Sequence, residues 1–174
     1  HTRWATHGKP SEENAHPHVS NNRVFIVHNG IIENHTTLRT YLSDHGHTFQ
    51  SDTDTEVLAH LVGHFYQGDL ESAVRQALNE VTGAYAIAVV CANEPGVLVV
   101  ARKGSPLMIG VGSDEYIVAS DASAIVAHTN RAIELEDDTI ARLTKDNFRT
   151  STLENVTVTP QMRELEVDLQ QIEL

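Results

Sequence analysis

The amino-acid sequence predicts an α+β protein in which antiparallel sheets are covered by helices on the outside. Segments with helical periodicity are grouped in residues 38–81, whereas short apolar runs, separated by Gly, Pro, Asn and Asp, follow from residue 84 onward. This grouping argues against the regular strand–helix alternation of a parallel sheet. A chain of 174 residues with 40% hydrophobic residues fits one domain with a buried core.

Three helices are expected within the first half of the chain. Leu38, Tyr41 and Leu42 share one face of the first helix, which Gly46 ends. Residues 53–56 are Thr-Asp-Thr-Glu, a capping-box pattern that opens the second helix. The apolar face of this second helix consists of Val57, Leu58, Leu61, Val62 and Phe65. A third helix over residues 70–81 has a continuous apolar stripe formed by Leu70, Ala73, Val74, Ala77, Leu78 and Val81.

Strands are expected on either side of this helical region. Residues 1–22 are polar and are interpreted as an ordered loop, and residues 24–28 as a strand that Asn29-Gly30 closes. An antiparallel meander is predicted from four apolar runs at residues 84–91, 97–102, 107–111 and 116–119. The later elements are a short helix at 122–127, a strand at 139–143 and an acidic linker at 162–174.

Composition excludes several classes of partner. The formal charge of −12, from 24 acidic and 12 basic side chains, repels phosphate and argues against nucleic-acid binding. The longest apolar stretch, residues 84–92, is too short to span a membrane. A single cysteine, Cys91, rules out an internal disulfide framework and fits a reducing compartment. No leader pattern opens the chain, and we expect a cytoplasmic protein.

Polar residues are concentrated in three segments, at residues 3–8 with 14–18, at 28–30 and at 51–56. Asn29-Gly30 is either a hairpin turn or an oxyanion hole, in which an Asn amide and a Gly N–H converge on a developing charge. Asp54 either offsets the dipole of the predicted helix or, from an exposed position, binds a ligand ammonium. Arg3 is either a surface cation or a clamp for a small carboxylate. Together, Arg3 and Asp54 would form the two halves of an amino-acid site.

The eleven histidines raise the question of a metal site. His60 and His64 lie four residues apart beside Glu56, but the HExxH order is absent, and a solvated polar helix face explains them. Residues 16–18, His-Pro-His, are interpreted as loop architecture. Cys91 lies within an apolar run, without an evident cationic neighbour to activate its thiol, and is interpreted as a small core residue. We therefore expect no metal and no cofactor.

Four motifs identify a family. Residues 1–8 are His-Thr-Arg-Trp-Ala-Thr-His-Gly, 14–18 Asn-Ala-His-Pro-His, 28–35 His-Asn-Gly-Ile-Ile-Glu-Asn-His and 51–57 Ser-Asp-Thr-Asp-Thr-Glu-Val. In this order they closely resemble the glutaminase domain of glutamine–fructose-6-phosphate aminotransferases, which are class II glutamine amidotransferases with an N-terminal nucleophile. Shorter matches at 83–85, 102–107 and 119–121 extend the resemblance through the chain. The resemblance implies a four-layer αββα fold, two antiparallel sheets between helices, present only in part.

The resemblance also implies a reaction. In this family an N-terminal Cys attacks the side-chain amide of L-glutamine, its own α-amine acts as base, and water releases glutamate from a thioester. Ammonia then passes to a sugar-phosphate isomerase domain of the same polypeptide, which makes glucosamine 6-phosphate from fructose 6-phosphate. Carried over by motif, Arg3 binds the α-carboxylate of glutamine and Asp54 its α-ammonium, and Asn29 and Gly30 form the oxyanion hole.

The first motif is implied to form a loop that closes over glutamine. Trp4, Thr6 and His7 lie on this loop, with Thr6 and His7 near the substrate, and His16 helps to support it. Closure shields the thioester and the released ammonia from bulk water.

The sequence departs from the family at its start, because neither the nucleophilic Cys nor the first part of the domain precedes His1. Residues 1–174 are therefore interpreted as one glutaminase domain, truncated at its N-terminus and without the isomerase domain. We expect this chain alone to be inactive as a glutaminase. We also expect exposed sheet faces and unpaired edges to cause self-association into a homo-oligomer.

Two alternative functions remain open. Amidophosphoribosyltransferases share some motifs, but they usually have Arg-Tyr-Ser-Thr, Gln-Pro-Phe and Asn-Gly-Asn where this chain has Arg-Trp-Ala-Thr at 3–6, His-Pro-His at 16–18 and Asn-Gly-Ile at 29–31. The other alternative is a non-catalytic amino-acid-binding module that keeps Arg3 and Asp54 without a nucleophile. The acceptor sugar is not encoded in these residues, because the resemblance places its selection in the second domain.

Overall fold

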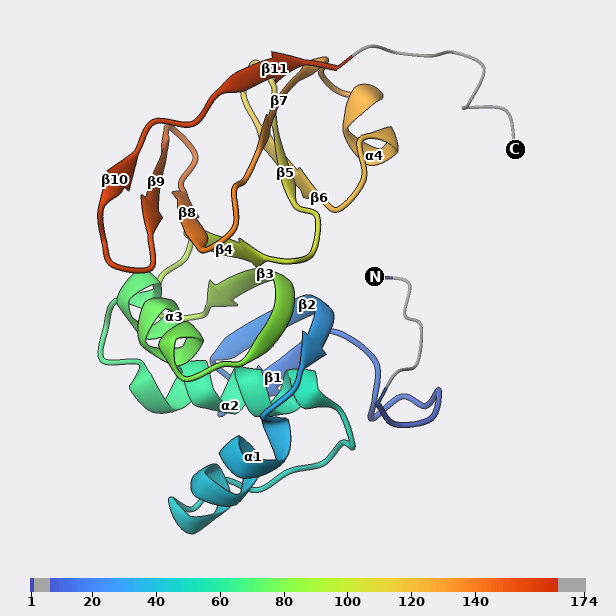
Figure 1. Ribbon diagram of the computed structural model, residues 1–174, viewed down its shortest axis with the longest axis vertical. Coiled ribbons are helices and arrows are strands. Elements are labelled where there is room, and N and C mark those ends of the chain that lie inside the picture. The colour runs from blue at the N-terminus through green and yellow to red at the C-terminus, as the bar shows by residue number, and fades with distance from the viewer. Residues whose placement is uncertain (2–6, 166–174) are drawn as a thin grey trace.

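The computed structural model describes His1 and residues 7–165 (Figure 1), which form two antiparallel sheets and four helices. The larger sheet contains, from edge to edge, β1 (His18–Ser20), β2 (Val24–Ile32), β3 (Gly83–Cys91), β4 (Leu98–Lys103), β8 (Thr139–Leu143), β9 (Phe148–Thr152) and β10 (Thr157–Val158). The smaller sheet contains, also from edge to edge, β11 (Met162–Glu164), β7 (Arg131–Glu134), β5 (Met108–Val111) and β6 (Tyr116–Ala119). The helices are α1 (His35–Asp44), α2 (Asp54–Phe65), α3 (Leu70–Asn79) and α4 (Ser123–Val126).

The elements stack in layers. α2 packs on β1 and β2 and α3 on β4 and β8, whereas α4 contacts β6. In Figure 1, α1, α2 and α3 lie together on one side of the larger sheet, and α4 lies far from them beside the smaller sheet. The described residues therefore have the αββα order of layers that the resemblance implied, and the predicted α+β class is confirmed.

Alternation along the strands divides the core into two parts, because successive side chains point to opposite faces of a sheet. In β3, Tyr85, Ile87 and Val89 point towards the helices and join the cluster formed with α2 and α3. Ala86 of β3 and Val100 of β4 point the other way and pack with residues of the smaller sheet. Cys91 is 3% exposed within the helix-side cluster, as expected for a small core residue.

The predicted single meander over residues 84–119 is wrong. Its first two runs are β3 and β4 of the larger sheet, whereas its last two are β5 and β6 of the smaller sheet. The chain changes sheets after β4, where Gly104 has a φ of 67°. Short apolar runs indicate strands but do not indicate which strands they pair with, because pairing depends on contacts distant in the sequence.

The N-terminal region contains a hairpin where a loop was expected. β1 pairs with β2, and the turn between them has Asn21 and Asn22 at φ values of 52° and 51°, as in a type I′ turn. β2 then continues through Asn29-Gly30 to Ile32, paired with β3 throughout, so the hairpin-turn interpretation of Asn29-Gly30 is wrong. Within residues 162–174, Met162–Glu164 is a strand rather than linker, and residues 166–174 lie outside the described residues.

The three long helices are present, with three corrections. α1 buries Leu38 and Leu42, but Tyr41 is 41% exposed and does not belong to its packed face. α2 is buried along all of Asp54–Gly63, so it has no solvated face over these residues. α3 buries the predicted stripe from Leu70 to Leu78 and ends before Val81. No described helix has both the length and the apolar character that a membrane span requires.

Candidate functional site

The end of β2 and the start of α2 meet at one hydrogen bond. The backbone N–H of Ile32 donates to Oδ2 of Asp54 at 2.8 Å, although 22 residues separate them in sequence. Asp54 is 5% exposed, so the expectation of an exposed carboxylate is wrong. The strand bearing Asn29 and Gly30 is thereby attached to the first turn of the helix that begins with Asp54.

Gly30 has a backbone that other residues rarely adopt. Its φ is 145°, and a Cβ atom there would lie 2.1 Å from the carbonyl oxygen of Ala84 and 2.9 Å from Nε2 of His28. Glycine is required at this position on both counts. The preceding Asn29 is exposed, so its amide is accessible beside a backbone segment that only glycine can form.

His28, Thr55 and His16 form a chain of hydrogen bonds beneath this segment. His28 is buried, and burial lowers its pKa against the opposing effect of the Asp54 carboxylate, so its imidazole is neutral at pH 7. Its Nε2 lies 3.4 Å from the carbonyl oxygen of Ala84 and must be the N–H donor there. Nδ1 of His28 then accepts the Thr55 hydroxyl proton at 3.0 Å, and the Thr55 oxygen accepts from Nε2 of His16 at 3.2 Å.

Aromatic contacts place the N-terminal loop on the same elements. His16 stacks on His1 with ring centroids 4.0 Å apart, and His7 meets the edge of His35 at 4.7 Å. Nε2 of His1 lies 3.0 Å from the carbonyl oxygen of His28. His7 and His16 therefore lie close to the starts of α1 and α2 respectively. Arg3, Trp4 and Thr6 lie outside the described residues.

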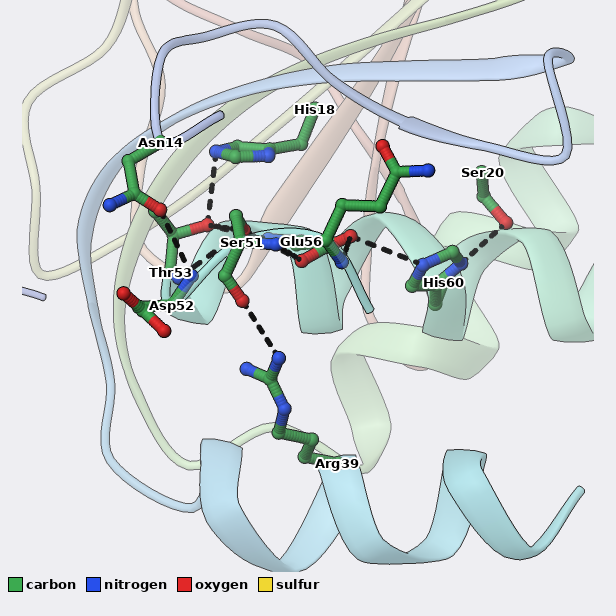
Figure 2. Close-up of polar contacts among 10 residues, drawn as sticks. Asn14, His18, Ser20, Arg39, Ser51, Asp52, Thr53, Glu56 and His60 are labelled. Carbon is green, nitrogen blue, oxygen red and sulfur yellow. Dashed lines mark hydrogen bonds and ion pairs between the residues drawn. The ribbon is translucent and has the colours of Figure 1, made fainter. Parts of the chain in front are cut away.

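Glu56, two residues after Asp54, binds the chain segment that leads into α2 (Figure 2). Its carboxylate accepts from the backbone N–H of Gln50 at 2.8 Å, the N–H of Ser51 at 2.7 Å and the Ser51 hydroxyl at 2.6 Å. The Thr53 hydroxyl accepts from the N–H of Glu56 at 3.2 Å, which confirms the predicted N-cap. The carboxylate does not complete the reciprocal half of a capping box, since it bonds Gln50 and Ser51 instead.

The same segment contacts three other parts of the fold, namely β1, the N-terminal loop and α1, as Figure 2 shows. Nε2 of His18 lies 2.9 Å from the Thr53 hydroxyl, and the N–H of Asp52 donates to Oδ1 of Asn14 at 2.9 Å. Arg39 of α1 donates to the carbonyl oxygen of Ser51 at 2.7 Å. Residues 51–53 thus join the N-terminal loop, α1 and α2.

The expectation of a solvated face at Glu56 and His60 is wrong. These residues are 5% and 7% exposed, and Nδ1 of His60 lies 3.1 Å from the Ser20 hydroxyl. Nε2 of His60 lies 3.7 Å from the Glu56 carboxylate. Among the described residues, no group of three or more His, Cys, Asp or Glu side chains is arranged to bind a metal.

Sequence reasoning placed three of these residues in motifs but assigned them no site role, namely His28, Thr55 and Glu56. Thr55 has no local signal, because its partners His16 and His28 are distant in the sequence. His28 has the signal of a polar residue inside an apolar strand run, which must find a partner when it is buried. For Glu56, the capping-box pattern was misleading, because it assigned the carboxylate to the backbone N–H of Thr53.

The arrangement is chemically suited to a ligand with an ammonium group. A buried carboxylate at Asp54 can accept hydrogen bonds from an ammonium group. The neighbouring Asn29–Gly30 segment presents an exposed amide beside glycine backbone, and such groups stabilise a developing oxyanion.

Comparisons with known proteins show the family of the chain. A family model described as a glutamine amidotransferase domain matches residues 1–127. A glutamine–fructose-6-phosphate aminotransferase (isomerizing) of Chlorobaculum tepidum is 50% identical over 178 residues, which cover 99% of this chain and 29% of the relative. The protein of the same name from Bordetella pertussis is 54% identical over 148 residues, which cover 82% of this chain and 24% of the relative. The chain therefore spans less than a third of the length of these relatives.

A solved structure shares the fold. The glutamine phosphoribosylpyrophosphate amidotransferase of B. subtilis, complexed with ADP and GMP, superposes with a TM-score of 0.74 at 30% identity. The match covers 88% of this chain and 34% of that one.

Proposed function

Because this chain belongs to the glutamine amidotransferase family, we propose that it is the glutamine-binding part of a glutaminase that releases ammonia from L-glutamine. The observation that supports this most directly is the hydrogen bond from Ile32 to Asp54. It brings a candidate ammonium acceptor and a candidate oxyanion hole, which are distant in sequence, to one place.

Each end of glutamine has a proposed partner. Asp54 uses Oδ2 for the Ile32 N–H, and the remaining lone pairs of a carboxylate can accept from the α-ammonium group. Arg3 would clamp the α-carboxylate, in keeping with the motif that contains it. Trp4, Thr6 and His7 would close over the substrate, and His16 would support that loop through its contact with Thr55.

The side-chain amide of glutamine would react at Asn29 and Gly30. Attack on the amide carbon moves negative charge onto the amide oxygen, and the Asn29 amide and the Gly30 N–H would donate to that oxygen. The clash that a Cβ at residue 30 would make with Ala84 supports a role for glycine backbone at this point. Such donors act without reorganising, because β2 and β3 fix the backbone.

The nucleophile would come from outside these residues. Cys91, the single cysteine of the sequence, is 3% exposed and packs on the helix side of β3, away from solvent. The 174 residues alone should therefore release no ammonia from glutamine.

The test is glutamate release from L-glutamine by the native polypeptide that contains these residues, compared with residues 1–174 alone. Turnover by the native polypeptide only, lost when its N-terminal Cys is changed to Ala, is the expected result. Saturable glutamine binding without turnover in either would favour the non-catalytic amino-acid-binding module. Turnover by residues 1–174 alone would contradict the assignment of the nucleophile.

For the whole enzyme we propose fructose 6-phosphate as acceptor and glucosamine 6-phosphate as product, with ammonia delivered to an isomerase domain of the same polypeptide. Support comes from identities of 50% and 54% to aminotransferases of that name, against 30% to the phosphoribosylpyrophosphate amidotransferase. Glucosamine 6-phosphate formed by the native polypeptide from glutamine and fructose 6-phosphate is the expected outcome. Consumption of phosphoribosylpyrophosphate instead would favour the alternative.

We also propose a homo-oligomer in the cytoplasm. Ile31 and Val90 are each 42% exposed, and both lie on the face of the larger sheet that is turned towards the smaller sheet. Exposed apolar residues on a sheet face favour association. The single cysteine fits a reducing compartment. Light scattering of residues 1–174 at increasing concentration should show growing mass, and a constant monomer mass would contradict association.

A further inference from the structure

We propose that Glu56 is a positioning residue for glutamine recognition, which acts by fixing residues 50–53 and thereby Asp54 and the N-terminal loop. The proposal rests on the proposed function of Asp54 as ammonium acceptor. It concerns a buried carboxylate that does not itself face the ligand.

The first argument is where the Glu56 carboxylate is directed. Oε1 accepts from the N–H of Gln50, and Oε2 accepts from both the N–H and the hydroxyl of Ser51. All three donors belong to the segment that precedes α2, and the Thr53 hydroxyl already caps the helix. Glu56 is therefore not needed as a cap, and its bonds fold the preceding segment back onto the first turn.

The second argument is what this segment determines. Asp54 follows directly after it, so the position of Ser51 and Thr53 sets where the Asp54 carboxylate lies. The N–H of Asp52 binds Asn14 of the N-terminal loop. A Cβ on Gly8 of that loop would lie 2.6 Å from Nδ2 of Asn14 and 3.1 Å from Cβ of Asp52, so loop and segment are in close contact.

The third argument is electrostatic. Burial raises the pKa of Glu56, but the contact with His60 and the donors from Ser51 and Gln50 outweigh it and lower the pKa to about 2. Glu56 is thus ionised at neutral pH, with both oxygens occupied by the protein. Because Glu56 meets these local donors, Asp54 remains the carboxylate of the first turn that can bind a ligand ammonium.

The experiment measures kcat and KM for glutamine hydrolysis by the native polypeptide and its Glu56→Gln variant. A carboxamide has one acceptor oxygen, and its NH2 group would face the donors on residues 50 and 51. We expect KM to rise about tenfold while kcat changes less than about twofold, in line with loss of a charged hydrogen-bond acceptor. A substrate analogue that lacks the α-amino group should show a smaller penalty, since Asp54 has no ammonium to bind there and only the position of the N-terminal loop still matters.

Glu71→Gln is the matched control. Glu71 is also a buried helix glutamate, at 6% exposure, and it binds Arg75 of α3 and Arg149 of β9 rather than residues 50–53. Its variant should lower the melting temperature and leave KM unchanged. If Glu56→Gln behaves in the same way, with a lower melting temperature and an unchanged KM, Glu56 is merely structural and the proposal is overturned.

Two further variants keep the outcomes separate. Asp54→Asn tests the proposed function itself, and an unchanged KM in this variant would reject that function. A raised KM for Asp54→Asn with an unchanged KM for Glu56→Gln would reject only the positioning role. If Glu56→Gln does not fold, Ser51→Ala removes one of the three donors to Glu56, and a KM unchanged by this milder variant would likewise overturn the proposal.

Discussion

Ile32 and Asp54 join a strand end to a helix start through a hydrogen bond of 2.8 Å from backbone N–H to carboxylate. The bond leaves Asp54 buried at 5% exposure yet adjacent to the strand that carries the exposed Asn29. A carboxylate held by backbone is preorganised, so little conformational entropy is lost when it binds an ammonium group. The pairing of β2 with β3 in turn holds the strand end that donates this bond.

Replacing Asp54 by Asn should weaken glutamine binding without unfolding the protein. The carboxamide oxygen of this variant can still accept the Ile32 N–H, but the negative charge that would bind the α-ammonium is lost. We expect KM of the native polypeptide for glutamine to rise about 10- to 100-fold, as for loss of a charged hydrogen-bond partner. Asp52→Asn is the matched control, because Asp52 is exposed and its backbone N–H, rather than its carboxylate, binds Asn14. An equal effect of both variants would indicate a general charge effect and contradict the assignment.

Replacing Gly30 by Ala should destabilise the chain and abolish turnover by the native polypeptide. A Cβ at φ 145° would lie 2.1 Å from the carbonyl oxygen of Ala84, so β2 would have to move away from β3. We expect a loss of about 1–3 kcal/mol in the free energy of unfolding, measured by urea denaturation.

Gly68→Ala separates strain from contact in this experiment. Gly68 also has a positive φ, 101°, but a Cβ there would meet nothing within 4 Å. Its variant should lose about 1 kcal/mol from backbone strain alone. A loss as large as that of Gly30→Ala would show that the contact with Ala84 contributes nothing.

The helices could be predicted from sequence because their signal is local. The apolar stripe of α3 and the Thr53 cap of α2 depend on residues within a few positions, and both are present. Tyr41 was grouped with Leu38 and Leu42 on one apolar face but is exposed. Periodicity gives the direction of a side chain, but it does not show whether a neighbouring element covers that side chain. The pairing of the strands was predicted wrongly for a related reason. Whether residues 107–111 join one sheet or the other depends on contacts with residues that are distant in the sequence.

The residues of the candidate site could be predicted from the sequence, but their arrangement in space could not. Asn29 and Asp54 were identified from their motifs, and each also had an ordinary structural explanation. What joins them is a bond between Ile32 and Asp54 that no local pattern specifies. Likewise, the Thr-x-x-Glu pattern predicted a reciprocal capping box. The Glu56 carboxylate instead binds Gln50 and Ser51, because these two residues lie against the first turn of α2.

Stability should fall as the pH drops below 6.5, because of His28. Burial lowers the pKa of His28 from 6.5, so below pH 6.5 the unfolded state binds more protons than the folded state and is favoured. His47 acts in the same direction, since burial and the nearby His60, His64 and His45 lower its pKa. Glu56, with its pKa lowered from 4.5 to about 2, adds a further loss only as the pH falls from 4.5 towards 2.

Urea denaturation at intervals between pH 4.5 and 8 would measure this dependence. His28→Gln should flatten the slope below pH 6.5, because the neutral side chain takes up no proton. His128→Gln is the control for the loss of a histidine as such, since 54% of the His128 side chain is exposed. An unaltered slope for His28→Gln would mean that His28 is not the titrating group.

Arg149 and Arg75 should make Glu71 important for stability. Oε2 of Glu71 accepts from Nη2 of Arg149 at 2.6 Å and from its Nε at 3.0 Å, and Oε1 accepts from Arg75 at 2.9 Å. The side chains of Glu71 and Arg75 are 8% and 13% exposed, so solvent compensates little for a lost charge. Glu71→Gln should therefore reduce the free energy of unfolding by about 2 kcal/mol in urea denaturation, because it leaves a buried guanidinium without its ionic partner. Glu115→Gln, at a 3.7 Å contact with His128 in which both side chains are more than half exposed, should cost almost nothing, and equal losses for the two would show that burial does not decide the effect.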